Sequence, residues 1–583
     1  MKKILICLVI ILTAALGCKN DPLDIIPDGR ITLNDVFKDE KQTEAYVARA
    51  YSHIPSYFSR YQFWSYLAGC SDEAQDADVG NEGSSAAGQW NTGSLNVMRN
   101  PLEQNGQGRV LRYSAFWAGI RDANVLLTRL PTANVPDPKN RLRYEGEAKA
   151  LRAFYYLELI KQYGPMPIID KELDATFDYT SLIRPTFQQI TDFIVKDCDE
   201  AIANPELPLR IIDENQRGRF TKAVAYAIKS QVLLYNASLL WNPSNDRAKW
   251  QAASTASQQA IAALTAGNNY QLFPNYEQYH FSFSDVTPTP NDRETIFEIK
   301  DAGNALITNT NAMTGQLGQF KVGSSPSQEL VDAYEMRVTG LQAITGYTNT
   351  EHLNPIINTA SGYNENNPYV GRDPRFYATV WHNGAIRPGV NNGAPIEIYR
   401  GGRQQLLKTP PNRRNTHTGY FLRKFLNPLV LGGQVAQTRW KKYHLSEIYL
   451  NLAEAENEAN GATAIAYNAV NVVRARAGMP NLTSSLGQLD FQKRIRNERQ
   501  VELAFEEHRF WDVRRWKILS QTDKLVTGNE IVRVGTAPNI TLTYNRFVVS
   551  RRSAWEDRFL IFPIPLTDAS IIPDFGANQN PGW

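Results

Sequence analysis

The sequence predicts a mainly α-helical protein, in which tetratricopeptide-like helix pairs stand beside a large loop-rich lobe with short strands. Before about residue 266 and after about residue 440, apolar side chains recur three or four positions apart, the spacing of one helical face. Between about 268 and 439 this period is weak, and Gly, Pro and Asn recur. Paired helices with short turns favour helix-turn-helix repeats. Because the consensus Trp-x₂-Leu-Gly-x₂-Tyr pattern is absent, an unrelated helical bundle with inserted loops is the alternative.

The first residues predict a lipoprotein signal peptide over 1–17. Lys2 and Lys3 precede an apolar run from Ile4 to Leu16, which is too short to span a bilayer. A small residue directly before Cys18 is typical of signals that are cut before a cysteine, which then carries lipid. An ordinary secretory signal is the alternative. We therefore expect a mature chain that begins at Cys18, a lipidated tether over 18–34, and one folded region over 35–583.

The remaining elements follow from the spacing of apolar residues and from stop signals such as Gly164-Pro165. Short strands are expected over 295–299 and 376–380, and a long surface loop over 69–108, where Gly, Ser, Asn and acidic residues gather. The expected helices are about 35–57, 109–130, 139–163, 185–203, 221–241, 247–266, 444–459, 463–477 and 489–507. The helix pairs thus fall within about 35–266 and 440–518, on either side of the insertion.

The composition of the chain narrows the classes of function that it can have. Hydrophobic residues make up 42% of the 583 residues and charged residues 21%, as in folded globular chains. A net charge of +3 makes no electrostatic case for nucleic acid, and after the signal no apolar run is long enough to cross a membrane. Cys70 and Cys198 form either a disulfide or two free thiols.

Several motifs, in this order and after a lipoprotein signal, resemble those of the SusD/RagB outer-membrane lipoproteins of Bacteroidetes. The likeness extends over essentially the whole mature chain. The clearest segments are Ser71-Asp-Glu-Ala74, Gly146-Glu-Ala-Lys-Ala-Leu-Arg-Ala-Phe-Tyr-Tyr156, Arg372-Asp-Pro-Arg375, Arg509-Phe-Trp-Asp512 and Gln579-Asn-Pro-Gly-Trp583.

The resemblance implies a superhelix of tetratricopeptide-like helix pairs with the ligand site on the loop-rich side. It also implies a cell-surface protein of the outer membrane that captures a glycan and delivers it to a SusC-like TonB-dependent transporter, without catalysis. A peptide- or glycopeptide-binding relative, a surface glycoside hydrolase and a helical-repeat adaptor for protein ligands are the alternatives.

The most catalytic-looking residues are Glu498, Glu502 and Glu506, which share one helical stripe. A glycosidase needs one carboxyl group with a raised pKa. Because several arginines lie close in sequence, we interpret the glutamates as a structural ion network. The seven histidines form no zinc motif, and no nucleotide-binding loop or nucleophile elbow is present. No cofactor, metal or catalytic residue is therefore predicted.

Sugar capture needs an aromatic ring for the C–H face of a pyranose and polar groups for its hydroxyls. The resemblance places binding residues in the 69–108 loop, where Asp72 could also cap a turn and Asp72, Glu73, Asp76 and Asp78 could hold Ca²⁺, although solvation is the better interpretation. For each aromatic candidate, ordinary packing is the alternative. The glycan-binding candidates are Trp90, Asn91, Asp72, Tyr276, Tyr279, Phe281 and Trp381.

Overall fold

The computed structural model describes residues 31–583 apart from 59–60, 79–84, 104–111, 281–291, 301–305, 317–318, 409–411, 427–438 and 537. The described chain is mainly helical, with strands only in small two-stranded sheets, which confirms the predicted fold class. The signal segment, Cys18 and the tether up to residue 30 lie outside the described residues.

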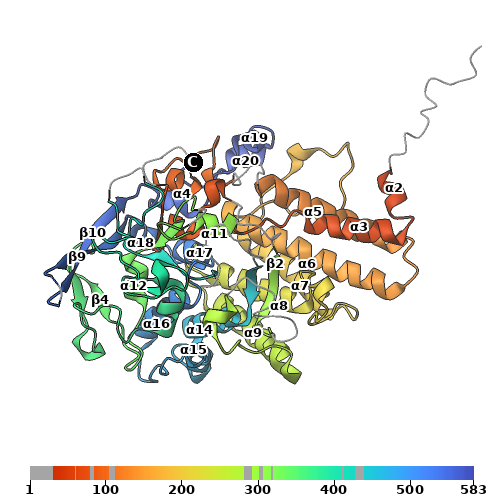
Figure 1. The fold of residues 1–583 in the computed structure, drawn as a ribbon. Helices are drawn as coiled ribbons and strands as arrows, with labels where there is room; N and C mark the ends of the chain where they lie inside the picture. The colour runs from red at the N-terminus through yellow and green to blue at the C-terminus, as the bar shows by residue number, and fades with distance from the viewer. Residues whose placement is uncertain are drawn as a thin grey trace, which may run out of the picture.

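Most of the long helices follow the predicted segments closely, since each carries a buried face of apolar residues. The expected helix over 35–57 is instead α2 followed by α3, because Asp39 caps the start of α3, which ends at Tyr51. They pack in sequence order, α5 on α6, α6 on α7, α7 on α8 and α8 on α9, and α14 packs on α9, α15 and α16. Figure 1 shows α3, α5, α6 and α7 on one side of the molecule and β4, β9 and β10 on the other. The helices with at least eight residues are α3 (Glu40–Tyr51), α5 (Arg112–Arg129), α6 (Pro138–Tyr163), α7 (Phe187–Ala203), α8 (Lys222–Ala237), α9 (Arg247–Thr265), α14 (Leu445–Asn460), α15 (Ala464–Arg476), α16 (Gln488–Glu502) and α17 (His508–Arg515).

Local signals explain where these helices begin and end. The side chain of Asp137 accepts a hydrogen bond from the backbone of Lys139 at the start of α6, and Pro138 occupies the first turn. The helix ends at Gly164, whose φ of +71° suits glycine. The shorter helices are α2 (Leu33–Val36), α4 (Ala86–Asn91), α10 (Tyr276–Tyr279), α11 (Leu306–Thr310), α12 (Gln328–Ala333), α13 (Pro374–Thr379), α18 (Leu519–Thr522), α19 (Leu566–Ala569) and α20 (Pro573–Ala577).

The strands pair antiparallel, two at a time. In one pair Thr295 lies opposite His444, so the strands on either side of the loop-rich insertion are joined. The pairs are β1 (Ala74–Asp76) with β3 (Ser324–Pro326), β2 (Thr295–Lys300) with β8 (Arg439–His444), β4 (Ile344–Tyr347) with β5 (Pro355–Ile357), β6 (Val380–Trp381) with β7 (Phe421–Leu422), and β9 (Leu525–Val534) with β10 (Thr541–Arg551).

Two expectations need correction, and one element was not expected at all. The strand at 376–380 is wrong: most of it belongs to α13, because Asp373 caps the helix and Pro374 starts it. The 69–108 segment is only partly a surface loop: residues 69–78 and 85–91, with β1 and α4, are almost all buried, whereas residues 92–100 are mostly exposed or half-buried. The hairpin of β9 and β10 was not expected from the sequence. The predicted strand at 295–299 is confirmed as β2.

The largest hydrophobic core joins the N-terminal helices to the C-terminal segment around Phe559 and Phe562. Cys70 and Cys198 are both buried and free, so the free-thiol alternative is the one observed. Among the described helices, none is both long enough and apolar enough to cross a membrane.

Candidate functional site

The two candidates at the end of α4 lie in the interior. Trp90 has no exposed surface, and its ring lies 5.3–5.8 Å from the rings of Phe510, Phe559 and Phe562. The amide of Asn91 donates a hydrogen bond of 2.9 Å to the carbonyl oxygen of Gly69. A sugar can stack only on an exposed ring face. Ordinary packing, the alternative for Trp90, therefore describes it in this structure.

Asp72 and the nearby acidic residues are held by cations from distant segments. Both carboxylate oxygens of Asp72 accept hydrogen bonds from Arg509, at 2.8 and 2.6 Å. Lys321 lies 3.3 Å from the carboxylates of both Asp76 and Asp78. Within the described residues no group of acidic, histidine or cysteine side chains is arranged to hold a metal ion.

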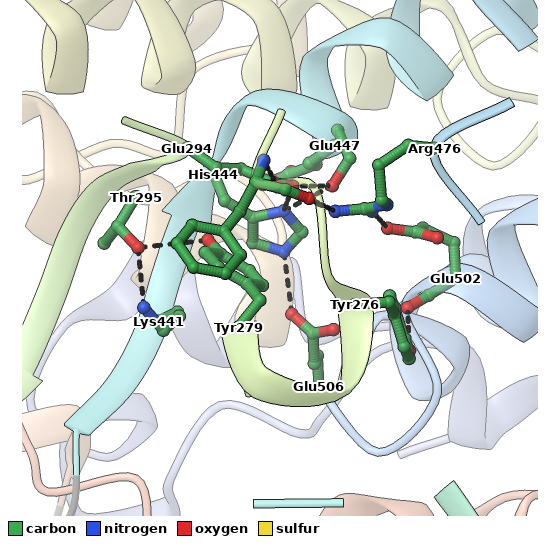
Figure 2. Close-up of polar contacts among 12 residues, drawn as sticks. Tyr276, Tyr279, Glu294, Thr295, Lys441, His444, Glu447, Arg476, Glu502 and Glu506 are labelled. Carbon is green, nitrogen blue, oxygen red and sulfur yellow. Dashed lines mark hydrogen bonds and ion pairs between the residues drawn. The ribbon is translucent and has the colours of Figure 1, made fainter. Parts of the chain in front are cut away.

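The tyrosine candidates line the polar network of Figure 2 rather than the surface. The hydroxyl of Tyr276 donates to the carbonyl oxygen of Glu502 at 2.8 Å, and that of Tyr279 accepts from Thr295 at 3.1 Å. Both rings are buried. Phe281 lies outside the described residues.

Trp381 in β6 is 2% exposed and belongs to a small hydrophobic core of the loop-rich lobe. The guanidinium carbon of Arg423 lies 4.2 Å from the centre of its ring. Because almost none of its surface is exposed, no ring face is open to a sugar, and here too packing is what the structure shows.

Glu498, Glu502 and Glu506 form the ion network that the sequence predicts, although α16 ends at Glu502 and Glu506 lies in the turn beyond it rather than on the same helical stripe. Arg375 lies 2.6 Å from Glu498 and 2.9 Å from Glu502, while Lys424 and His444 both lie 2.7 Å from Glu506. A second arginine, Arg474 for Glu498 and Arg476 for Glu502, completes two of the pairs.

The charges in this network keep the carboxyl groups ionised. Burial favours the neutral form of Glu506, but Lys424 and His444 outweigh it and lower its pKa to about 2. Arg375 and Arg474 likewise outweigh burial and lower the pKa of Glu498. A general acid requires a shift in the opposite direction, so these two groups are poorly suited to protonate a leaving group.

A different set of rings does reach the surface. Phe63 and Trp64 are partly exposed, and Phe320, which comes from a distant segment, is 37% exposed. The rings of Trp64 and Phe320 meet at 89° with their centres 5.6 Å apart. The guanidinium carbon of Arg413 lies 4.8 Å from the ring centre of Phe320 and 5.7 Å from that of Phe63. We call these three rings and Arg413 the aromatic platform.

The backbone and polar groups of the platform are unusual. Phe63 and Trp64 have φ angles of +56° and +54°, which large side chains rarely adopt and which concentrate at functional sites. The indole N–H of Trp64 is buried without a hydrogen-bond partner among the described residues. Arg413 is held in place by Asp78, whose carboxylate lies 2.6 Å from it.

The sequence reasoning missed the platform because its rings come from separate parts of the chain. Backbone hydrogen bonds bring two of these parts together: the N–H of Val322 donates to the carbonyl oxygen of Arg413, and that of Phe320 to Asn309. The Phe63-Trp64 pair outside any apolar period was the one available signal.

The described chain thus has a helical scaffold beside a loop-rich lobe, where an exposed cluster of aromatic rings lies. Comparison with known proteins identifies its family. The family model described as the SusD family matches residues 293–583, and one described as starch-binding and associating with the outer membrane matches residues 71–234. The chain belongs to the SusD/RagB family.

Individual relatives agree with this assignment. SusD-like protein P2 of Formosa agariphila is 22% identical over 89% of this chain and 91% of its own length. SusD-like protein P38 of the same organism is 24% identical, and there the match spans about half of either chain, 47% and 48%.

Solved structures match over nearly the whole chain. A SusD-like protein from Bacteroides fragilis has a TM-score of 0.75 and 26% identity over 95% of this chain and 99% of its own. A laminarin-binding SusD-like protein has a TM-score of 0.61 and 23% identity over 94% of this chain and all of its own length, which shows a shared fold.

Proposed function

We propose that this protein is a cell-surface lipoprotein that captures a glycan on the aromatic platform and passes it to a SusC-like TonB-dependent transporter. The observation that carries this proposal is the exposed cluster of Phe63, Trp64 and Phe320 beside Arg413. These three rings are partly exposed to solvent and lie beside the charged side chain of Arg413.

The chemistry of the platform suits a sugar. Ring faces cover the C–H side of a pyranose, and the partly exposed guanidinium of Arg413 can donate to hydroxyl oxygens. The Asp78 carboxylate fixes Arg413, so less conformational entropy is lost on binding. A starch-binding family model and a laminarin-binding neighbour support a glycan as the ligand class.

The proposal includes binding without turnover. The carboxyl groups of Glu498 and Glu506 are kept ionised by paired cations, and both are buried. The lipoprotein signal supports attachment through Cys18, and membership of the family supports release to a transporter.

Affinity electrophoresis tests the capture step. Lipid-free protein from Asn20 onward is run in gels that contain plant, fungal or host polysaccharides. We expect one glycan to retard the protein while the glycan chains keep their length. The double variant Trp64→Ala, Phe320→Ala should abolish the retardation. Val338→Ala, at a side chain that is 86% exposed and apart from the platform, is the matched control.

The other outcomes discriminate the alternatives. Shortened glycan chains would indicate a hydrolase, and the absence of retardation by every polysaccharide would favour a peptide or glycopeptide ligand. Retardation that survives the double variant would place the ligand elsewhere on the protein. For the transporter, we expect a SusC-like barrel to co-purify with the tagged full-length lipoprotein from detergent-solubilised outer membranes.

A further inference from the structure

A pocket separate from the platform lies where the turns after α6 and α8 meet the C-terminal segment. Its volume is about 750 Å³, and none of its lining residues belongs to the aromatic platform. We call it the C-terminal pocket. The lining residues that matter for the argument are Trp241, Lys517, Asp557 and Arg558, and Gly164 lies beside Trp241.

Trp241 forms a rigid aromatic wall of this pocket. The ring of Phe187 stacks on it with the centres 4.2 Å apart and an angle of 9° between the planes, which fixes the indole from one side. Trp241 itself is partly exposed. Gly164, with a φ of +71°, leaves the edge of the Trp241 ring uncovered. A Cβ atom at position 164 would lie 3.0 Å from the indole.

Two of the charged side chains that line the pocket have no partner among the described residues, and a third, Arg558, is paired with an exposed glutamate. Among the described residues, the ammonium group of Lys517 and the carboxylate of Asp557 have no ion pair and no side-chain hydrogen bond, and both residues are exposed. Arg558 is 41% exposed and lies 3.1 Å from Glu556. Lys517 has a φ of +55° because it closes α17, where the N–H of Ile518 donates to the carbonyl oxygen of Val513, so its backbone is fixed by the end of the helix.

Hydrogen bonds hold the chain segments around these groups in place. Arg184 donates hydrogen bonds of 2.7 Å to the carbonyl oxygen of Pro165 and 2.9 Å to the side chain of Asn580. Asn580 in turn donates to the carbonyl oxygens of Tyr163 and Phe562. The pocket therefore combines a backbone that is held by hydrogen bonds with exposed charged side chains. This arrangement favours binding of a polar ligand.

We propose that the C-terminal pocket is a second carbohydrate site, in which a pyranose ring lies against Trp241 and its hydroxyls bond to Lys517, Asp557 and Arg558. An aromatic face, one acceptor carboxylate and two cationic donors match the donor and acceptor hydroxyls of a neutral sugar. This site goes beyond the platform and does not require it. Two sites on one polysaccharide would strengthen capture through effective concentration.

Fluorine NMR of protein labelled with 5-fluorotryptophan tests both sites in one sample. The chain has 11 tryptophans, and single Trp→Phe variants assign the resonances of Trp64, Trp241 and the fully buried Trp90. The probes are laminarihexaose, maltohexaose, xylohexaose and mannohexaose. We expect at least one of them to shift the Trp241 resonance saturably while the Trp90 resonance stays in place.

Two variants make the result specific. Asp557→Ala should weaken the Trp241 titration by about three-fold or more, as expected for one lost hydrogen bond. Asp490→Ala, another exposed carboxylate that lies on α16, should leave the titration unchanged. The double variant Phe63→Ala, Phe320→Ala should also leave it unchanged, because the platform is a separate site.

The possible outcomes separate the two proposals. A Trp241 resonance that none of the four probes shifts overturns the second site, whatever the Trp64 resonance does. A shift of Trp241 with a silent Trp64 supports the second site and counts against the platform. A Trp241 shift that Asp557→Ala leaves intact, or that disappears in the platform variant, also overturns the proposal.

Discussion

Substituting Phe320 by alanine tests the platform quantitatively. Its side chain is 37% exposed in the free protein, so a ligand can remove at most about a third of its surface from water. Complete burial of a Phe side chain stabilises by about 1.5–3 kcal/mol. Phe320→Ala should therefore weaken the binding free energy of the glycan by about 0.5–1 kcal/mol, which corresponds to roughly a three- to six-fold increase in Kd.

The assay is affinity electrophoresis over a series of concentrations of the retained glycan, which yields Kd directly. Val338→Ala provides the matched exposed control, and far-ultraviolet circular dichroism shows whether each variant is folded. An unchanged Kd for Phe320→Ala would refute the role of this ring. A loss of about a hundred-fold with intact folding would refute the surface-area reasoning, because the exposed part of one ring cannot supply it.

Three further substitutions concern the interior. Arg375→Met removes the cation among buried carboxylates and should lower the free energy of unfolding by about 3–5 kcal/mol in urea titrations, whereas Lys493→Met, from an exposed pair, should change it by under about 1 kcal/mol; equal effects would contradict the network. Trp90→Ala should cost about 3–5 kcal/mol by the same measurement, and a near-neutral result would argue against its core position. Burial and the charge of Asp72 raise the pKa of Glu73 to about 8, so its contribution to stability is present below pH 4.5 and is lost as the pH rises through 8. Glu73→Gln should therefore gain stability over the parent chain between pH 5 and 8, by up to about 1.4 kcal/mol per pH unit, and a pH-independent difference would contradict the raised pKa.

The long helices could be predicted because their signals are local. The expected segment at 139–163 is α6 within one residue, since Asp137, Pro138 and Gly164 mark its ends. The wrong strand at 376–380 shows two local signals in conflict. Its Phe, Tyr, Thr and Val favour a strand, but the preceding Asp373-Pro374 cap starts a helix, and the cap decides the structure.

The 69–108 segment shows what local signals leave out. Its polar composition is typical of a surface loop, yet Asp72 and Asp78 are buried because Arg509, Lys321 and Arg413 pair with them across the fold. Such partners are hundreds of residues away in the chain. No window of sequence contains both members of a pair, so composition alone predicts exposure where long-range ion pairs produce burial.

The same reasoning explains the candidate aromatic residues. A tryptophan in a polar stretch is equally compatible with a stacking platform and with a core, and only its neighbours decide between them. Trp90 meets three phenylalanines from the C-terminal part of the chain and is enclosed. Trp64 meets Phe320 at the edge of the loop-rich lobe and stays partly exposed. The residue type thus indicates that a ring could stack on a ligand, whereas the long-range contacts of each ring determine whether it is exposed enough to do so.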